Sequence, residues 1–351
     1  MVTLETTIMD QAPWRVHPRG LGRKLLPWVG LSFWLLSTGP GATPQNSTPP
    51  DVQALEGQSH DINPLFQLRV ARSLGTVDGD ESPEVPKTYL DMTAAELAKA
   101  VPELKHLQPA ESQDMLPQIL QQVGASVAAF FDNFPNTACT ESIISNVDTP
   151  LKINAFHYHN KYNYVALAKA GAMKGRLREY RTDAEGEPVQ PDAKTGVVTL
   201  GFVSLSVHFY PDYQADSRFR YLGREAMEKP DTYVVAFAQR PQVARQTASV
   251  QFLGRSGTVF LQGVAWIDPV SFRIVRLRTD IQQPESNVGL LKETTEVLFS
   301  EVSFTHSDKT LWLPREVTVT GQLEKYLFRN QHRYTDYRLF NVEVEQKQDK
   351  P

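Results

Sequence analysis

Residues 264 to 279, VAWIDPVSFRIVRLRT, form two apolar runs separated by the polar break Asp268-Pro269-Val270-Ser271. A short polar break between two such runs predicts a β-hairpin. If Asp268 and Ser271 bracket the turn, Ile267 faces Phe272 across it. Because side chains alternate along a strand, one face of the hairpin would then carry Val264, Trp266, Val275 and Leu277. A hairpin this apolar needs cover on both sides or encloses something apolar.

The chain reads as β-structure from about residue 137 almost to its end. The strands expected are 140–146, 153–168, 175–182, 218–227, 232–239, 247–254, 257–268, 272–279, 294–304, 314–320 and 326–345. Short turns between consecutive strands predict an antiparallel meander. Residues 201–210, GFVSLSVHFY, are the exception, because Phe202, Leu205 and Phe209 recur at helical spacing and favour a helix lying across the sheet.

Two helices are expected before the strands. Thr93 and Glu96 have the spacing of a capping box and open a short helix that Pro102 ends after Val101. A longer helix is predicted over 112–133. Its apolar positions form one stripe made of Leu116, Ile119, Leu120, Val123, Val127, Phe130 and Phe131. Such a stripe predicts packing on the sheet rather than cofactor binding.

The N-terminal part of the chain differs in composition from the rest. Basic residues precede the apolar run LLPWVGLSFWLL and then small residues that end at Ala42, so 1–42 is predicted to be a signal peptide. Residues 43–88 are rich in Pro, Ser, Gly, Asp and Glu and predict a flexible linker. No later stretch is apolar for long enough to span a membrane. The mature chain is therefore expected to be exported and to have no transmembrane segment.

Charge and motifs exclude several classes of protein. The net charge of −4 gives no reason to expect a nucleic-acid partner. Cys139 is the single cysteine, so no internal disulfide can form, and burial is more typical of it than catalysis. The sequence has no nucleophile elbow, phosphate-binding loop, HExxH or CxxC motif. We therefore expect a non-enzymatic protein without a cofactor or catalytic residue.

Two clusters of polar residues are candidate sites. His157 and His159 project to one face of a strand and could bind a metal with His208, but polar positions in an aromatic strand explain them better, and no metal site is predicted. The last strand carries Arg329, His332, Arg333, Asp336 and Arg338. These could hold an anionic head group, although cross-strand ion pairing on a solvent-facing side is favoured.

Three short motifs suggest a family. Trp266-Ile267-Asp268-Pro269, the returning Ile274-Val275-Arg276-Leu277 and the later Leu313-Pro314 resemble the outer-membrane lipoprotein-sorting superfamily of LolA, LolB and RseB-type proteins. Within it, the chain looks closest to a divergent, little-characterised bacterial group. The resemblance implies an α+β fold in which an antiparallel curved sheet of about eleven strands forms an unclosed β-barrel, with helices covering the open side. Residues 137–351 would form this half-barrel, and 89–136 a helical segment packing on it.

The resemblance also implies a function. The protein would be a periplasmic binding protein whose hollow takes acyl chains or lipidated polypeptide, and the family name implies a role in lipoprotein sorting. A periplasmic sensor or scaffold that binds an envelope protein is the alternative. The predicted cavity wall is made of Phe260, Val264, Trp266, Val275 and Leu277. The same face could instead be filled by the 112–133 helix and form an ordinary core.

Overall fold

The computed structural model describes residues 87–148, 156–168, 177–189, 199–225, 231–252, 255–304 and 307–340. All of these belong to one compact unit, Asp61–Phe340. The predicted signal peptide and nearly all of the predicted linker lie outside the described residues. Within the described ranges, none of the helices has the length and apolar character needed to cross a membrane.

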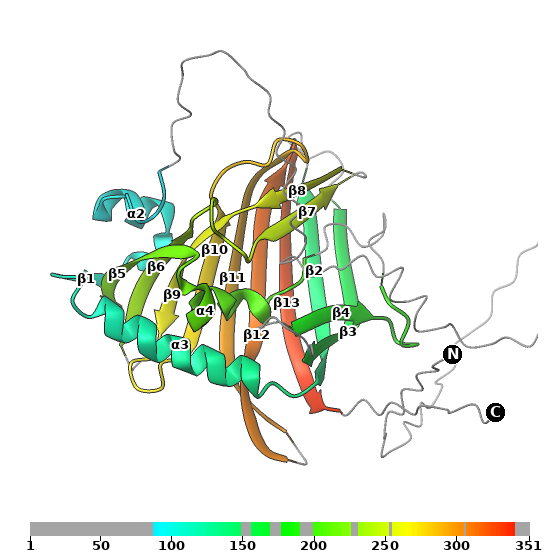
Figure 1. Ribbon diagram of the computed structural model, residues 1–351. Helices are drawn as coiled ribbons and strands as arrows, with labels where there is room; N and C mark the ends of the chain where they lie inside the picture. The colour runs from blue at the N-terminus through cyan, green and yellow to red at the C-terminus, as the bar shows by residue number, and fades with distance from the viewer. Residues whose placement is uncertain are drawn as a thin grey trace, which may run out of the picture. The chain divides into compact units, whose positions relative to one another are not determined.

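Eleven strands form one antiparallel sheet in the order β1-β5-β6-β9-β10-β11-β12-β13-β2-β3-β4 (Figure 1). Their bounds are β1 Leu107–Pro109, β2 Thr137–Asp148, β3 Phe156–Ala168, β4 Leu177–Thr182, β5 Ser217–Glu225, β6 Thr232–Gln239, β9 Leu261–Ile267, β10 Ile274–Ile281, β11 Leu290–Phe304, β12 Ser307–Leu323 and β13 Tyr326–Leu339. A separate hairpin is formed by β7 Ala248–Phe252 and β8 Arg255–Val259. Among the described residues β1 and β4 are the free edges of the large sheet, so it does not close into a barrel. The predicted fold class is confirmed.

The order of the strands departs from a simple meander. Strands β9 to β13 follow one another as predicted, but β13 pairs with β2, so β2 to β4 extend the sheet on one side and β5 and β6 on the other. The predicted strand 257–268 is in fact two strands, β8 and β9, which separate at Phe260. The short strand β1 was not expected. The chain must therefore cross the sheet twice, once before β2 and once after β4.

Helical segments make both crossings, and they share one face of the sheet. Helix α3, Leu116–Asp132, connects β1 to β2 and begins four residues later than predicted. The 3₁₀-helix η2, Ser204–Phe209, and the short helix α4, Pro211–Gln214, lie between β4 and β5. The helix expected across the sheet at 201–210 is thus confirmed, in 3₁₀ form. Figure 1 shows α3 and α4 in front of the sheet.

Close packing joins the two crossings. Ile119, Val123, Val127 and Phe131 of α3 are buried in the main core together with Phe209 of η2. A Cβ atom on Gly124 would lie 2.6 Å from the side-chain nitrogen of Gln214 and 3.3 Å from the carbonyl oxygen of Phe209. Glycine at this position lets α3 approach η2 and α4 closely.

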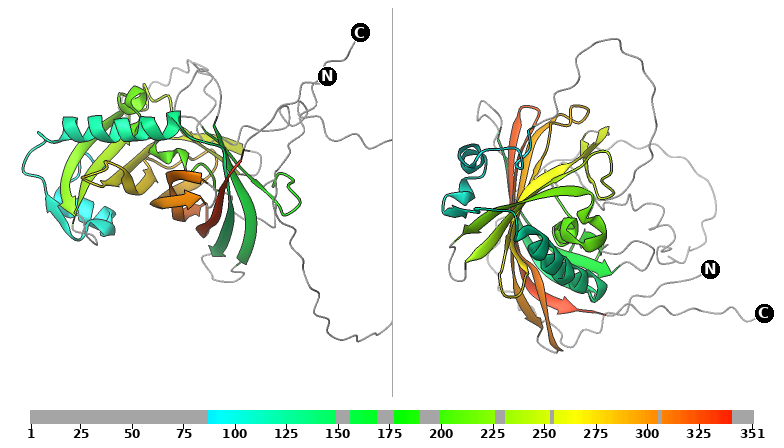
Figure 2. Two further views of the ribbon diagram at one scale, coloured as in Figure 1. Left: turned by 90° about the horizontal axis from the view of Figure 1, so that it is seen from below. Right: turned by 60° about the vertical axis from the view of Figure 1, so that its left-hand side comes forward.

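The opposite face of the sheet is covered by a different segment. Helix α2, Ala94–Ala100, has the predicted capping box, with Thr93 accepting from the Glu96 amide, and ends before the 3₁₀-helix η1, Pro102–Leu104. A second core cluster joins Leu97, Val101 and Leu104 to Val264 and Trp266 of β9. Figure 2 shows α2 and α3 on opposite faces of the sheet.

The β9–β10 hairpin forms, but the predicted register is wrong. Ile267 pairs with Ile274 rather than Phe272, and beyond a bulge Leu277 pairs with Ala265. The turn is therefore longer than the polar break suggests. The bulge moves Leu277 to the face under α3, while Val264 and Trp266 lie on the other face against the segment that contains α2 and η1.

Candidate functional site

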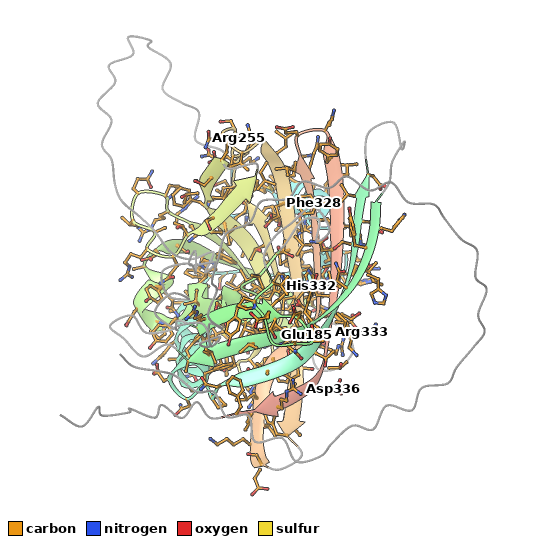
Figure 3. The ribbon with its side chains drawn as sticks, turned by 90° about the vertical axis from the view of Figure 1, so that its right-hand side faces the viewer. Glu185, Arg255, Phe328, His332, Arg333 and Asp336 are labelled. Atoms are coloured by element: carbon orange, nitrogen blue, oxygen red, sulfur yellow. The ribbon has the colours of Figure 1, made fainter. Side chains whose placement is uncertain are left out.

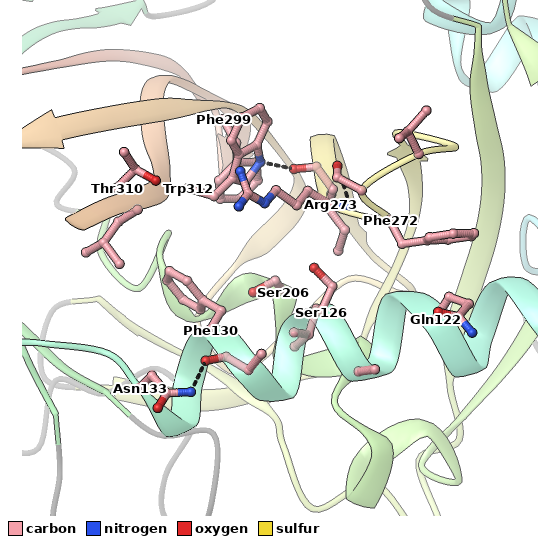
Figure 4. Close-up of a pocket in the computed structure, with 17 residues that line it drawn as sticks. Gln122, Ser126, Phe130, Asn133, Ser206, Phe272, Arg273, Phe299, Thr310 and Trp312 are labelled. Carbon is pink, nitrogen blue, oxygen red and sulfur yellow. Dashed lines mark hydrogen bonds between the residues drawn. The ribbon is translucent and has the colours of Figure 1, made fainter. Parts of the chain in front are cut away.

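A cavity of about 600 Å³ lies between α3 on one side and the β9–β10 turn, β11 and β12 on the other (Figure 4). We call it the hollow. Helix α3 contributes one wall with Phe130, and the other wall is made of Phe272 in the turn and of Phe299, Leu311 and Trp312 on the strands. Its remaining lining residues are Gln122, Ala125, Ser126, Val127, Ala129, Asn133, Ser206, Val270, Ser271, Arg273, Ile274 and Thr310. The volume is in the range of small-molecule sites, and the walls are mainly apolar.

The β9–β10 turn is fixed by one carboxylate. An oxygen of Asp268 accepts hydrogen bonds from the Val270 amide at 3.1 Å, from the Ser271 amide at 2.6 Å and from the Ser271 hydroxyl at 2.7 Å. Burial would raise the pKa of Asp268, but these bonds, with those from Ser271 the larger, hold it below its usual value. Asp268 is therefore an ionised cap that sets the shape of the turn.

The capped turn places an aromatic side chain at the hollow. Phe272 has a φ of 54°, in the left-handed region that bulky residues rarely adopt. Its ring stacks on Tyr233 with 6.1 Å between centroids. Val270, at the tip of the turn, is 83% exposed, so apolar surface continues from the hollow to solvent. The turn holds a strained conformation that brings Phe272 into the wall.

Trp312 and Arg273 meet at the hollow (Figure 4). The indole nitrogen of Trp312 donates to the carbonyl oxygen of Ile274 at 2.7 Å, which fixes the ring. The Arg273 guanidinium lies 5.4 Å from the centre of that ring, a cation–π distance. Its ion pair with Glu301 is long, at 3.6 Å, and both side chains are exposed. Such a pair contributes only about 0–1 kcal/mol.

A second region under the same face is filled with polar groups instead. Glu141 of β2 accepts two bonds from the Arg181 guanidinium of β4, one bond from His332 of β13 at 2.9 Å and one from the Tyr334 hydroxyl at 2.8 Å. Arg181 also donates to the carbonyl oxygen of Thr199 at 2.7 Å. The side chains of Arg181 and Glu141 are 3% and 0% exposed. We call this group the polar cluster; Figure 3 marks His332 within it.

The charges within the polar cluster are balanced. Burial alone would raise the pKa of Glu141, but the charge and hydrogen bonds of Arg181 lower it to about 2. Burial lowers the pKa of His332 and outweighs its bond to Glu141, so the imidazole is neutral near pH 7. Glu141 and Arg181 therefore form a buried ion pair in which both side chains are charged.

Glu179 attaches the second crossing to the sheet. It accepts bonds from the Tyr164 hydroxyl, the Ser204 hydroxyl, the Ser204 amide at 3.0 Å and the Val203 amide at 3.2 Å. Burial raises the pKa of this carboxyl. The polar cluster and Glu179 together fix the start of η2 beneath β2, β4 and β13.

The five residues predicted to line a cavity lie on different faces. Val264 and Trp266 are fully buried on the face that α2 and η1 cover, and Val275 packs there as well. Leu277 lies in the core beneath α3, and Phe260 lies between β8 and β9. Their role in ligand binding stays a prediction. The hollow is instead formed by the turn of the same hairpin and by strands that sequence reasoning had not assigned to a site.

The other candidates occupy separate places. His157 and His159 are exposed on β3, where His159 is 3.0 Å from the Ser142 hydroxyl, while His208 is buried and stacked on Phe237. The described residues contain no group of three potential ligands placed to hold a metal. Cys139 is buried, as predicted, and burial raises its pKa, which disfavours a nucleophilic thiolate.

Of the basic residues of β13, the arginines Arg329, Arg333 and Arg338 are exposed and His332 is buried. His332 points into the polar cluster, whereas Arg333 is exposed and 3.5 Å from Glu316 of β12 (Figure 3). Arg338 donates to the side-chain oxygen of Asn163 at 3.3 Å. The favoured interpretation, cross-strand pairing on a solvent-facing side, thus fits Arg333 but not His332.

Comparisons with known proteins give structural neighbours only. No family model matches the chain, and no curated protein matches it. Three solved structures are similar to it. The first is a LolA superfamily protein from Nitrosomonas europaea, with 13% identity and a TM-score of 0.33 over 64% of this chain and 94% of that one. The second is a putative outer membrane lipoprotein-sorting protein domain from Vibrio parahaemolyticus, with 11% identity and a TM-score of 0.32 over 64% of this chain and 94% of that one. The third is a DUF1329 family protein from Desulfovibrio piger, with 11% identity and a TM-score of 0.30 over 62% of this chain and 93% of that one.

Proposed function

We propose that the protein is a non-enzymatic binding protein whose hollow takes the acyl chain of a lipid or of a lipidated polypeptide. The observation that carries the proposal is the hollow itself, with Phe130 on α3 facing Phe299 and Leu311 on the strands. Burial of an acyl chain yields about 0.8 kcal/mol per CH₂ without any catalytic group. The exposed Val270 beside the hollow gives a chain an apolar route from solvent.

The proposal includes export to the periplasm, which rests on the predicted signal peptide at 1–42. Fractionation of cells that express the full chain tests this part. Recovery of a shortened protein with the periplasmic contents is expected. Full-length protein retained with the cytoplasm would refute export without bearing on acyl-chain binding.

The binding test uses a pair of matched substitutions. Leu311→Gln puts a polar side chain in the wall of the hollow, while Leu327→Gln makes the same change at an exposed position near the other end of β12 and β13. Calorimetry with 1-lauroylglycerol should show binding by the wild type and by Leu327→Gln. Leu311→Gln should bind at least about tenfold more weakly, because a buried Leu is worth about 1.5–3 kcal/mol.

Two peptide arms separate the sources of the acyl chain. A palmitoylated peptide should compete with 1-lauroylglycerol, and the same peptide without its lipid should not. Wild-type protein that binds neither lauroylglycerol nor the palmitoylated peptide would refute the proposal. Equal binding of both peptides would instead favour the alternative, a scaffold that recognises a protein partner.

A further inference from the structure

The charge distribution around the hollow narrows the class of its ligand. Among the described residues that line it, Arg273 carries the single formal charge, and the polar remainder are neutral Ser, Thr, Asn and Gln side chains. A cavity with apolar walls and one cation suits a molecule that has an apolar chain and one anionic group.

Arg273 is positioned before any ligand arrives. It follows directly after the turn that Asp268 caps, and its backbone carbonyl accepts from the Asp268 amide at 2.9 Å. Trp312, 5.4 Å beneath the guanidinium, is itself held by the bond to Ile274. A guanidinium held over a fixed indole has fewer conformations to lose on binding, and its planar fork of N–H groups can donate two hydrogen bonds to a carboxylate or phosphate.

The positive charge of Arg273 is also poorly neutralised. Its partner Glu301 of β11 is 3.6 Å away and has an exposed side chain, and Glu301 does not line the hollow. By contrast, Arg278 on the opposite face lies 2.8 Å from Glu103 and 3.0 Å from Asp280. An anionic ligand could therefore take the place of Glu301 at small cost.

We propose that the hollow selects anionic single-chain amphiphiles, with Arg273 binding the carboxylate or phosphate head and Phe130, Phe299 and Leu311 binding the chain. This inference rests on the proposed function and names the ligand class of the same site. Arg273 is then the residue that determines specificity, while the apolar walls supply the common part of the affinity.

The test compares two ligands that share one chain. Laurate is anionic and 1-lauroylglycerol is uncharged, and both are titrated below their aggregation concentrations. Wild-type protein should bind laurate about tenfold more tightly than lauroylglycerol, because a hydrogen bond to a charged group is stronger than one between neutral groups. Arg273→Gln should lose this preference and keep its affinity for lauroylglycerol within about twofold.

Two further variants control the result. Arg255→Gln removes another half-exposed arginine, paired with Glu324 at 3.1 Å, and should leave both affinities unchanged. Glu301→Gln frees Arg273 and should strengthen laurate binding by up to about fivefold. A merely structural role for Arg273 would not produce this gain.

The outcomes separate the two proposals. Equal binding of laurate and lauroylglycerol by the wild type would overturn the anionic preference and leave acyl-chain binding intact. Equal loss of both ligands in a folded Arg273→Gln protein would also overturn it, because Arg273 would then only shape the wall. Binding of neither ligand would refute the function on which the inference rests. Repeating the titration with lauroyl lysophosphatidic acid compares a phosphate head with the carboxylate head of laurate and shows which of the two Arg273 binds more tightly.

Discussion

The hollow and the polar cluster lie under the same face of one sheet, yet they are built from different chemistry. In the polar cluster every strand contributes a polar side chain that another strand satisfies, as Arg181 does for Glu141. In the hollow the strands and α3 contribute apolar side chains that leave about 600 Å³ unfilled. Under the proposed function, the polar cluster fixes the crossing segment and the hollow receives the ligand. Each region should then respond to its own substitutions.

The largest effect is expected from Arg181→Met. It leaves the buried carboxylate of Glu141 without its charged partner, and breaking such a pair costs about 3–5 kcal/mol. Urea unfolding followed by circular dichroism should show this loss in the free energy of unfolding. The double variant Glu141→Gln/Arg181→Met should recover part of the loss, because no uncompensated charge remains.

Arg181→Met also tests whether the hollow depends on the polar cluster, when ligand binding is measured in place of stability. Folded Arg181→Met protein should bind 1-lauroylglycerol with wild-type affinity if the two regions are independent. A parallel loss of affinity would show that the hollow depends on the polar cluster through η2, which supplies Ser206 to the hollow.

Acid should lower the free energy of unfolding through the polar cluster by at most about as much as Arg181→Met does. The pKa of Glu141 is about 2 in the folded protein against an ordinary 4.5, so its contribution to stability is present above pH 4.5 and is lost as pH falls toward 2. The pKa of His332 is also depressed, which favours unfolding as pH falls below its ordinary 6.5. Unfolding midpoints measured from pH 7 to 3 should fall more steeply in the wild type than in Glu141→Gln/Arg181→Met. Parallel curves would contradict this.

The smallest expected effect is a change in tryptophan emission, and it compares two tryptophans on opposite faces of the sheet. Trp312 lines the hollow, whereas Trp266 is 0% exposed on the other face and donates to Glu225. Addition of lauroylglycerol should change tryptophan emission in the wild type and in Trp266→Phe, but not in Trp312→Phe. The reverse pattern would place the ligand at the cavity wall first predicted from Val264 and Trp266.

Sequence patterns predicted the elements better than their register. The capping box at Thr93, the stripe of α3 and most strands depend on local periodicity, which the sequence displays directly. The register of the β9–β10 hairpin depends on the side chain of Asp268, which caps a long turn and allows Phe272 a left-handed conformation. Alternation of polar and apolar residues carries no signal for such a turn, nor for the bulge between Ile274 and Arg276 that places Leu277 on the other face.

The two regions were missed for a related reason. Glu141, Arg181 and His332 lie on β2, β4 and β13, where each is an ordinary polar residue in a strand. Only the pairing of β13 with β2 brings them together, and single-sequence patterns do not show which strands pair. Phe299 fell within a predicted strand, but Leu311 and Trp312 lay before the predicted start at 314, so their position beside α3 could not be inferred.

The pairing of β13 with β2 has a consequence for how the chain folds. Tyr334 and Glu141 are 193 positions apart, so the sheet is completed only after its last strand has been synthesised. Contacts between such distant segments carry a large loop-closure cost and are typical of slowly folding topologies. A sheet that lacks β13 leaves one edge of β2 unpaired and Glu141 without two of its hydrogen-bond donors, so pairing of β13 would complete the sheet and the polar cluster in one late folding step.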